Sequence, residues 1–217
     1  MQSGFCVAGV DEESGRWIRP VRPSGHVAAR DLQDAASGVV QPLDLVEFEL
    51  IRAKPSRPHV EDWIANFNRR LVIQQRPDEG DRLAMLERLA EASPASVLAS
   101  KQRSLVMVEP ASISARFVPP TGDRPYQARI SFALAGTEFE GELGQGYPCT
   151  DLRLRSWGRR FPAARTLSDP QLREALGVRR IFLAIGLSRE FQGNYWPMVV
   201  GFHTCPDFDA EIDLARP

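Results

Sequence analysis

Short apolar runs recur along the chain, and turn-forming residues separate them. The runs 5–10 and 16–21, with DEESG between them, predict an antiparallel hairpin. The run 44–53 alternates apolar and acidic residues except for a slip at Val46. It predicts a third strand that either has a bulge or is buried on both faces. Apolar residues at helical spacing predict a helix over 78–93, just before Pro94.

Proline and glycine divide the rest of the chain. The segments 104–110 and 112–118 predict two strands around Pro110, and PPTGD at 119–123 is the strongest candidate for a linker. Beyond this linker the pattern begins again. It predicts a hairpin across Ala135–Gly136, a strand at 150–158, a helix at 167–177 with Ser168 or Asp169 as N-cap, and strands at 179–188 and 195–204.

Both halves therefore have the same order of elements: a hairpin, a third strand, a helical connection and further strands. Small β-barrels of the OB type have this layout, with five strands and a helix between the third and the fourth. The sequence predicts a mainly β fold with minor α content, made of two tandem OB-type small β-barrels. Residues 1–120 would form the first barrel, with a helical insertion, and residues 121–217 the second. A single mixed α+β domain is the alternative.

Composition places the chain among globular proteins. It has 43% hydrophobic and 25% charged residues, which is enough for a real core, and its net charge of -1 provides no overall attraction to nucleic acid or membrane. No apolar run approaches the roughly 18 residues that span a bilayer, and no signal peptide is recognised. Three cysteines without a CxxC pair indicate reduced thiols. We expect a cytoplasmic protein with no membrane partner.

The densest candidate site is RLRSWGRRFPAAR, residues 153–165, which contains arginines and aromatic residues but no acid. On the predicted strand, Arg153 and Arg155 share one face, and Trp157, Arg159 and Arg160 follow at its exit. Arg129 and the pair Arg179–Arg180 are candidates to enlarge this patch. Cationic groups that contact phosphates, together with a planar ring that stacks on a base, are what binding to a single strand requires. The alternative is a solvated strand edge whose charges prevent aggregation.

A second candidate lies in the strand 16–22. Trp17 and Arg19 share one face of this strand, so they form a candidate base-stacking and phosphate-contacting pair. The competing interpretation places Trp17 in the core, with Arg19 either lying over a neighbouring residue or paired to Asp11 or Glu47.

Catalytic and metal-binding interpretations have less support in the sequence. His203 and Cys205 could supply two ligands from one strand face, but zinc needs at least one more. Cys149 with His203 and Asp151 would need an orienting geometry that sequence does not show. We predict no metal site and no cofactor, and an enzyme, such as a metal-dependent hydrolase, is the least favoured class.

Seven motifs, taken in order, resemble one known family, the dual OB-fold-containing domain family of bacterial proteins. They are CVAGVDEESGRWIRPVR, LDLVEFEL, PHVEDWI, SLVMVEP, ARISFALAGTEFEGELG, CTDLRLR, and IFLAIGLSREF with YWPMVVGFH. Together they cover nearly the full chain. The resemblance implies two OB folds, no defined enzymatic activity, and a role in nucleic-acid binding, often within prokaryotic conflict or defence systems.

Two functional classes remain open on the sequence. The first is binding of single-stranded DNA or RNA without sequence specificity, centred on the second half. The second is a docking module for a protein partner of a defence system, with Phe191, Tyr195 and Trp196 as its apolar surface.

Overall fold

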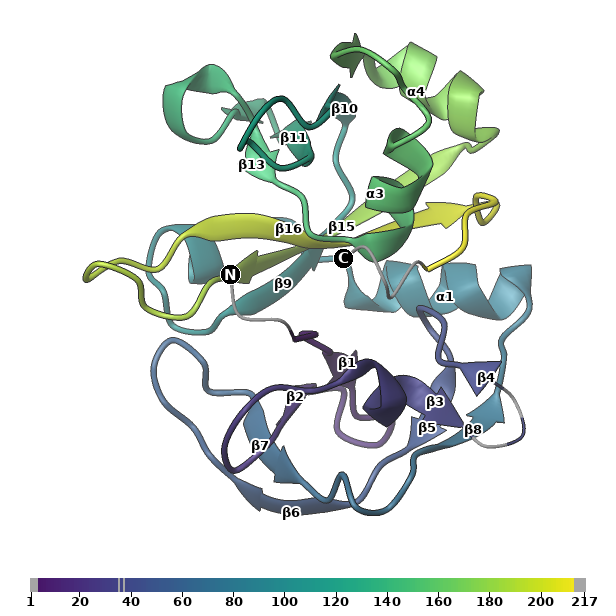
Figure 1. The fold of residues 1–217 in the computed structure, drawn as a ribbon, viewed down its shortest axis with the longest axis vertical. Coiled ribbons are helices and arrows are strands. Elements are labelled where there is room, and N and C mark those ends of the chain that lie inside the picture. The colour runs from purple at the N-terminus through teal and green to yellow at the C-terminus, as the bar shows by residue number, and fades with distance from the viewer. Residues whose placement is uncertain (1–3, 35, 37, 213–217) are drawn as a thin grey trace. The chain divides into compact units, whose positions relative to one another are not determined.

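The structure is a computed structural model that describes residues 4–34, 36 and 38–212, with the side chain of Leu143 excepted (Figure 1). Contacts between Cα atoms divide the chain into two compact units. The first unit holds residues 1–82 and 102–104, and the second holds residues 83–101 and 105–217. Among the helices of the described residues, none is long and apolar enough to cross a membrane.

The first unit is built from short strands. In chain order its elements are β1 (Gly9–Val10), β2 (Trp17–Val21), η1 (Ala29–Leu32), β3 (Gln33–Asp34), β4 (Gly38–Val39), β5 (Leu45–Glu47), β6 (Leu50–Ala53), β7 (Asp62–Ala65) and β8 (Val72–Gln75). The predicted hairpin is confirmed, because β1 pairs antiparallel with β2. The predicted single strand over 44–53 is instead two strands. β5 pairs with β8 and β6 pairs with β7, so the chain changes partners between them.

A buried ion pair joins β2 to β7 in the first unit. These two strands run parallel, with Arg19 opposite Asp62. The Arg19 Nε donates to Asp62 Oδ1 at 2.6 Å, and both side chains are almost fully excluded from solvent. Removing one partner of such a pair leaves an uncompensated buried charge, so this contact fixes how the two strands meet.

The second unit contains most of the helices and the longest strands. Its elements are α2 (Ala95–Leu98), β9 (Leu105–Val108), β10 (Ser112–Val118), β11 (Gln127–Leu134), β12 (Thr137–Phe139), η2 (Glu142–Gly144), β13 (Tyr147–Pro148), α3 (Leu152–Gly158), β14 (Arg165–Leu167), α4 (Asp169–Leu176), β15 (Arg180–Leu187) and β16 (Pro197–Cys205). The helix α1 (Glu79–Leu89), which the sequence predicted, begins in the first unit and ends in the second.

Strand pairing among the described residues of the second unit forms two sheets, which a single bridge connects. β10 pairs with β11, and β11 pairs with both β12 and β13. A parallel bridge between Cys149 and Val199 leads from the end of β13 to β16, which pairs with β15, and β15 pairs with β9. If β9 and β10 count as one bent first strand, five strands follow the order 1-2-3-5-4-1, with α3 between the third and the fourth. That order is the OB arrangement.

The core of the second unit follows from alternation along the strands. Inward positions such as Ile113, Phe117 and Ile130 are buried, whereas the intervening Ser114 and Arg116 face outward. Buried residues of α3, α4, β15 and β16 complete one continuous apolar cluster. The helix α4 begins as the sequence predicts, with Ser168 as N-cap.

The candidate linker at 119–123 is not a linker, and that prediction is wrong. β10 and β11 pair along their length from Ser112 opposite Ala133 to Val118 opposite Gln127. The residues between them form a hairpin loop, closed by reciprocal backbone hydrogen bonds between Thr121 and Arg124. Proline and glycine are as common in hairpin loops as in linkers, so composition alone did not separate the two. The compact units accordingly do not divide at 120/121, which lies inside this loop.

The predicted strand over 150–158 is also wrong, because these residues form the helix α3. Asp151 explains the difference. Its Oδ1 accepts a hydrogen bond from the Leu154 N–H at 2.7 Å, which caps the helix, and its Oδ2 accepts one from the Phe202 N–H of β16 at 3.1 Å. The Leu-Arg-Leu-Arg alternation resembles a strand, but Leu154 and Trp157, three residues apart, bury the same side of a helix.

We expect Asp151→Ala to lower the free energy of unfolding by about 2–4 kcal/mol. The variant loses a helix cap and leaves the buried Phe202 N–H without its acceptor. The matched control is Asp78→Ala, which removes an exposed carboxylate that accepts from the Asp81 N–H at the start of α1. It should cost about 1 kcal/mol or less. Chemical denaturation followed by circular dichroism compares the two, and equal losses would contradict the role given to Asp151.

Candidate nucleic-acid interface

Two of the predicted site residues in α3 are buried. Arg153 is only 6% exposed, and its guanidinium donates to Asp207 Oδ1 and to the carbonyl oxygens of Phe208 and Ala210. It also lies over the Phe208 ring, 4.5 Å from the centroid. Trp157 is 5% exposed and packs edge-on against Phe117. Arg153 therefore fastens the C-terminal segment, and Trp157 belongs to the core.

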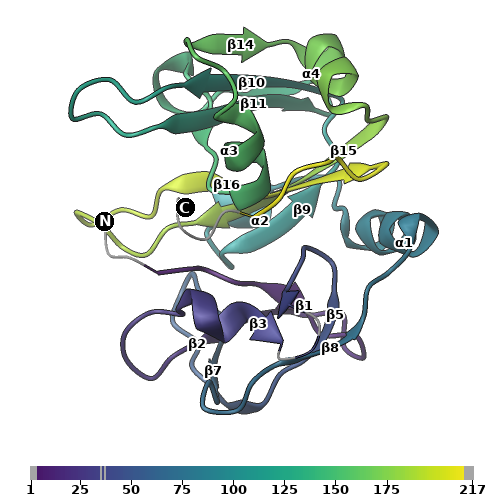
Figure 2. The same ribbon diagram turned by 45° about the vertical axis from the view of Figure 1, so that its right-hand side comes forward.

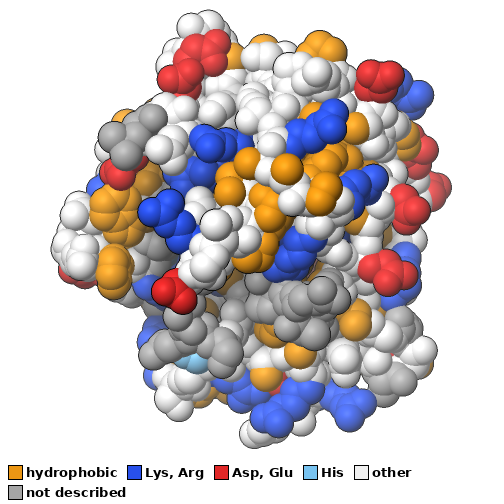
Figure 3. All heavy atoms as spheres, turned by 45° about the horizontal axis from the view of Figure 1, so that its top comes forward, with side chains coloured by type: hydrophobic (Ala, Val, Ile, Leu, Met, Phe, Trp, Pro, Cys, Tyr) orange, Lys and Arg blue, Asp and Glu red, His pale blue; other side chains and the backbone are white. Residues whose placement is uncertain are grey.

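Three further arginines, which we call the α3 arginines, are at least partly exposed and lie over aromatic rings: Arg155 within α3, and Arg159 and Arg160 directly after it. The guanidinium carbons of Arg155 and Arg159 are 5.3 and 5.0 Å from the centroid of Tyr126, and that of Arg160 is 4.2 Å from the centroid of Trp157. Figure 3 shows Lys and Arg side chains lying among hydrophobic ones on one face. Arg155 also donates to the Cys149 carbonyl and Arg160 to the Trp157 carbonyl, so stacking and hydrogen bonds together hold these guanidinium groups in place.

Trp17 and Arg19 lie in the first unit, apart in sequence and fold from the α3 residues. Arg19 is 5% exposed and is engaged by Asp62, not by Asp11 or Glu47. Trp17 is half-buried at the start of β2, opposite Val10. The Arg19 side chain is therefore not at the surface, where a phosphate contact would need it.

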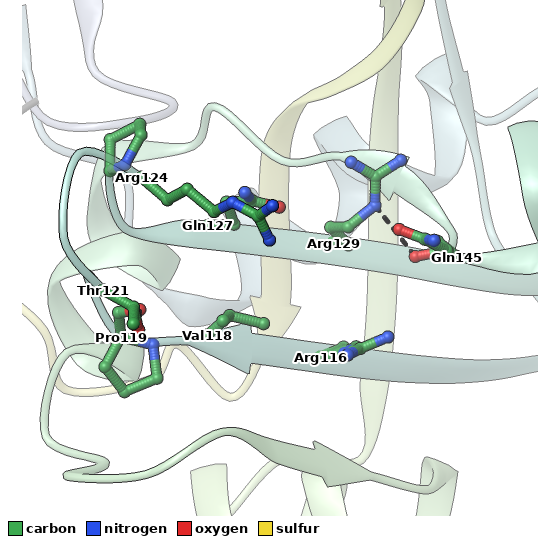
Figure 4. Close-up of a pocket in the computed structure, with 9 residues that line it drawn as sticks. Arg116, Val118, Pro119, Thr121, Arg124, Gln127, Arg129 and Gln145 are labelled. Carbon is green, nitrogen blue, oxygen red and sulfur yellow. Dashed lines mark hydrogen bonds between the residues drawn. The ribbon is translucent and has the colours of Figure 1, made fainter.

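A group of three arginines lines a hollow elsewhere, on the outward face of β10 and β11 (Figure 4). We call this hollow of about 450 Å³ the arginine pocket. Its lining includes Arg116, Val118, Arg124, Gln127, Arg129 and Gln145, and none of its lining residues carries a carboxylate. In Figure 4 the Arg124 side chain runs along β11 toward Gln127, and Arg116 lies on the neighbouring strand.

Arg116 and Arg129 stand directly opposite each other in the β10–β11 register. Like charges in that position repel, and burial together with Arg116 lowers the pKa of the Arg129 guanidinium, against a smaller opposing effect of Glu142. The Arg129 Nε donates to the Gln145 carbonyl at 2.9 Å and its Nη2 to the Gly146 carbonyl at 2.7 Å. Arg116 and Arg124 are exposed and, within the part of the chain that the structure describes, neither forms an ion pair.

The arginine pocket and the α3 arginines meet at one loop. Pro125 and Gln127 line the pocket, and between them Tyr126 turns its ring to the other side, under Arg155 and Arg159. The Tyr126 side chain is buried, and this burial raises the pKa of its hydroxyl to about 12. Cationic groups thus surround the β10–β11 loop on both sides.

The same face of the sheet becomes acidic farther from this loop. A second hollow, of about 370 Å³, is lined by Ser112, Ser114 and Ser131 together with Glu138, Glu140 and Asp169. An anionic ligand is therefore attracted to the loop end of β10 and β11 and repelled from their other end.

Sequence reasoning missed Arg116 and Arg124 and mentioned Arg129 only as an extension of the α3 cluster. The signal that could have revealed them is the alternation of polar and apolar residues along the two runs. Ser112, Ser114 and Arg116 share one face of one run, and Arg129 and Ser131 share one face of the next. Because 119–123 was interpreted as a linker, these two runs were not predicted to pair as neighbouring strands. Arg180, which was suggested as an extension of this cluster, instead pairs through its guanidinium with Glu109 and Glu87.

The residues considered for metal chemistry form no ligand cluster in the described part of the chain. No cluster of three His, Cys, Asp or Glu side chains suited to a metal ion occurs there. Cys149 is buried, and desolvation raises the pKa of its thiol, which works against the thiolate that a nucleophile or ligand needs.

Comparison with curated proteins and with solved structures finds no similar chain. Comparison with protein families finds one match, to the dual OB-containing domain, over residues 1–202. The strand order of the second unit agrees with it independently. On both grounds, the chain belongs to the family of dual OB-containing domains.

Proposed function

We propose that this protein binds single-stranded nucleic acid without sequence specificity, through the surface around the β10–β11 loop of its second unit. The observation that carries the proposal is the arginine pocket, in which Arg116, Arg124 and Arg129 line one hollow with no acidic side chain. Contacts to phosphates position a nucleic acid but carry no sequence information. We therefore expect affinity to depend on charge and little on base order.

Electrostatics favour an anionic ligand in this pocket. Arg116 and Arg129 are kept opposite each other although their charges repel, and an anion between them would relieve that repulsion. Arg129 donates to the backbone carbonyls of Gln145 and Gly146 and so holds that side of the pocket. Arg116 and Arg124, which are exposed, supply the cationic contacts. Guanidinium groups suit phosphate because their planar fork donates two parallel hydrogen bonds.

The location of the pocket within the fold supports the same ligand class. OB folds bind oligonucleotides on the face of their second and third strands and on the loops after the first and fourth strands. In the second unit the second strand is β11, the third is β12 with β13, and the loop after the first is 119–126. The third strand that the sequence predicts at 150–158 is instead the helix α3, so the proposed interface is centred on β11 and the pocket and not on a strand at 150–158.

Binding to a labelled oligonucleotide should weaken as salt rises. About three phosphate contacts at roughly 0.7 released ions each predict a log–log slope near -2. The double variant Arg116→Ala/Arg124→Ala should flatten this slope by about 1 to 1.5, because it removes the two arginines without acidic partners. Fluorescence anisotropy with oligothymidine and oligouridine, between about 50 and 200 mM salt, measures it.

The matched control for that variant is Arg70→Ala/Arg88→Ala, which removes two exposed arginines outside the pocket. It should keep the wild-type slope. A wild type that shows no salt-sensitive binding, or a pocket variant that binds as the control does, would overturn the proposed function.

Arg159→Ala/Arg160→Ala tests whether the α3 arginines extend the same surface. We expect the slope to flatten by about 1, since both guanidinium groups are at or near the surface beside the β10–β11 loop. Trp157→Ala is unsuitable as a test of base stacking, because truncating this buried ring should cost about 3–5 kcal/mol of stability. An unchanged slope in the double variant would limit the surface to the pocket.

A further inference from the structure

The arginine pocket concentrates positive charge on one spot of the sheet. Arg116 and Arg129 are directly opposite each other, so their Cα atoms lie about 5 Å apart and both side chains leave the same face. Arg124 reaches the same hollow from the β10–β11 loop (Figure 4). Three guanidinium groups around a hollow of about 450 Å³ suit one compact, highly charged group.

The neighbouring strands do not continue this charge across the face. Thr166 of β14 lies opposite Arg116, and Pro148 of β13 lies opposite Arg129. Neither of these two flanking side chains carries a charge. A nucleic acid that crossed the strands at this level would therefore leave the guanidinium groups after one phosphate.

Along the strands the charge reverses. Ser114 and Ser131 come two residues after the arginine pair, about 7 Å along each strand. Both serines line the second hollow, whose carboxylates belong to Glu138, Glu140 and Asp169. Figure 2 shows α4, which begins at Asp169, at the opposite end of β10 and β11 from their loop. A strand bound in the pocket that continued in this direction would bring its next phosphate close to like charge.

The side of the β10–β11 loop offers further cationic groups instead. Arg155 and Arg159 lie over the Tyr126 ring on the far side of this loop. The phosphates that follow the first one can contact guanidinium groups there. The charges of this unit thus favour a strand that has one end in the pocket and leaves it on the side of the loop.

We infer that the arginine pocket binds the terminal phosphate of a nucleic-acid strand, and that the strand leaves toward the β10–β11 loop and the α3 arginines. This inference rests on the proposed function and deepens it, because it names the ligand as a strand end that carries a phosphomonoester. A phosphomonoester has a charge of about -1.5 to -2 at neutral pH, whereas each phosphodiester within a strand has about -1. The additional charge suits two guanidinium groups that repel each other, Arg116 and Arg129.

A terminal phosphate should strengthen binding of a short oligothymidine by roughly 5- to 30-fold over the same oligomer with two hydroxyl ends, because exposed guanidinium groups gain charge-assisted hydrogen bonds. Fluorescence anisotropy at about 50 mM salt measures this, with the dye on the opposite end. The 5′-phosphate and the 3′-phosphate are tested separately, and a preference for either one supports the inference. A terminal phosphate blocked as its methyl ester keeps only one charge and should lose most of the gain.

The variant Arg116→Ala/Arg124→Ala should bind the phosphorylated and the hydroxyl-ended oligomer equally, because it removes the two exposed guanidinium groups of the pocket. The matched control is Arg70→Ala/Arg88→Ala, which removes two exposed arginines outside the pocket and should keep the wild-type preference.

The variant Glu138→Gln/Glu140→Gln tests the acidic end of the face. Both carboxylates are exposed, whereas Asp169 is paired with Arg173. Without these two charges a strand can continue past the pocket along β10 and β11. The hydroxyl-ended oligomer should then bind about 2- to 5-fold more tightly, and the preference for the terminal phosphate should narrow.

The outcomes separate this inference from the proposed function. If wild type binds both oligomers equally and in a salt-sensitive manner, the inference is overturned and the proposed function stands. A preference that persists in Arg116→Ala/Arg124→Ala also overturns the inference, because the strand end is then recognised elsewhere. Thymidine 5′-monophosphate that binds as tightly as the phosphorylated oligomer identifies a free nucleotide as the ligand and overturns both. A wild type that binds neither oligomer overturns both as well.

Discussion

The register between β10 and β11 is the constraint on which the second unit depends. With Ala115 opposite Ile130 and Phe117 opposite Ala128, all the inward positions of both strands reach the core together. A slip of one residue would turn the apolar set outward and bury the serines and arginines. The same register places Arg116 opposite Arg129, so the packing that stabilises the sheet also creates the cationic face.

Helix α3 depends on a second fixed point, the carboxylate of Asp151. By accepting from the N–H groups of Leu154 and Phe202, it starts the helix and ties it to β16. At the other end of the helix, Gly158 lies so close to Phe117 and Tyr126 that a Cβ at this position would collide with both side chains. That close approach brings Arg155 and Arg159 over the Tyr126 ring and so extends the cationic surface around the β10–β11 loop.

The arginines of this chain have three different uses. Arg19 and Arg153 are buried and satisfy internal acceptors, so they hold strands or the C-terminal segment together. Arg180 pairs with two glutamates. Arg116 and Arg124 line the arginine pocket instead, which is why the functional proposal depends on them and not on the number of arginines in any segment.

Local patterning of the sequence determined much of this protein: the mainly β composition, the first hairpin, the Ala135–Gly136 hairpin, the helices α1 and α4, and the long strands β15 and β16. Each follows from periodicity or capping within a few neighbouring residues. Tertiary structure decided the rest. Whether 119–123 forms a hairpin loop or a linker depends on the pairing of the strands on either side of it. Whether 152–158 forms a helix or a strand depends on the hydrogen bond between Asp151 and the N–H of Phe202, fifty-one residues away. The candidate site depends on such long-range pairing too, since Arg116 and Arg129 are distant in sequence and meet only across the sheet.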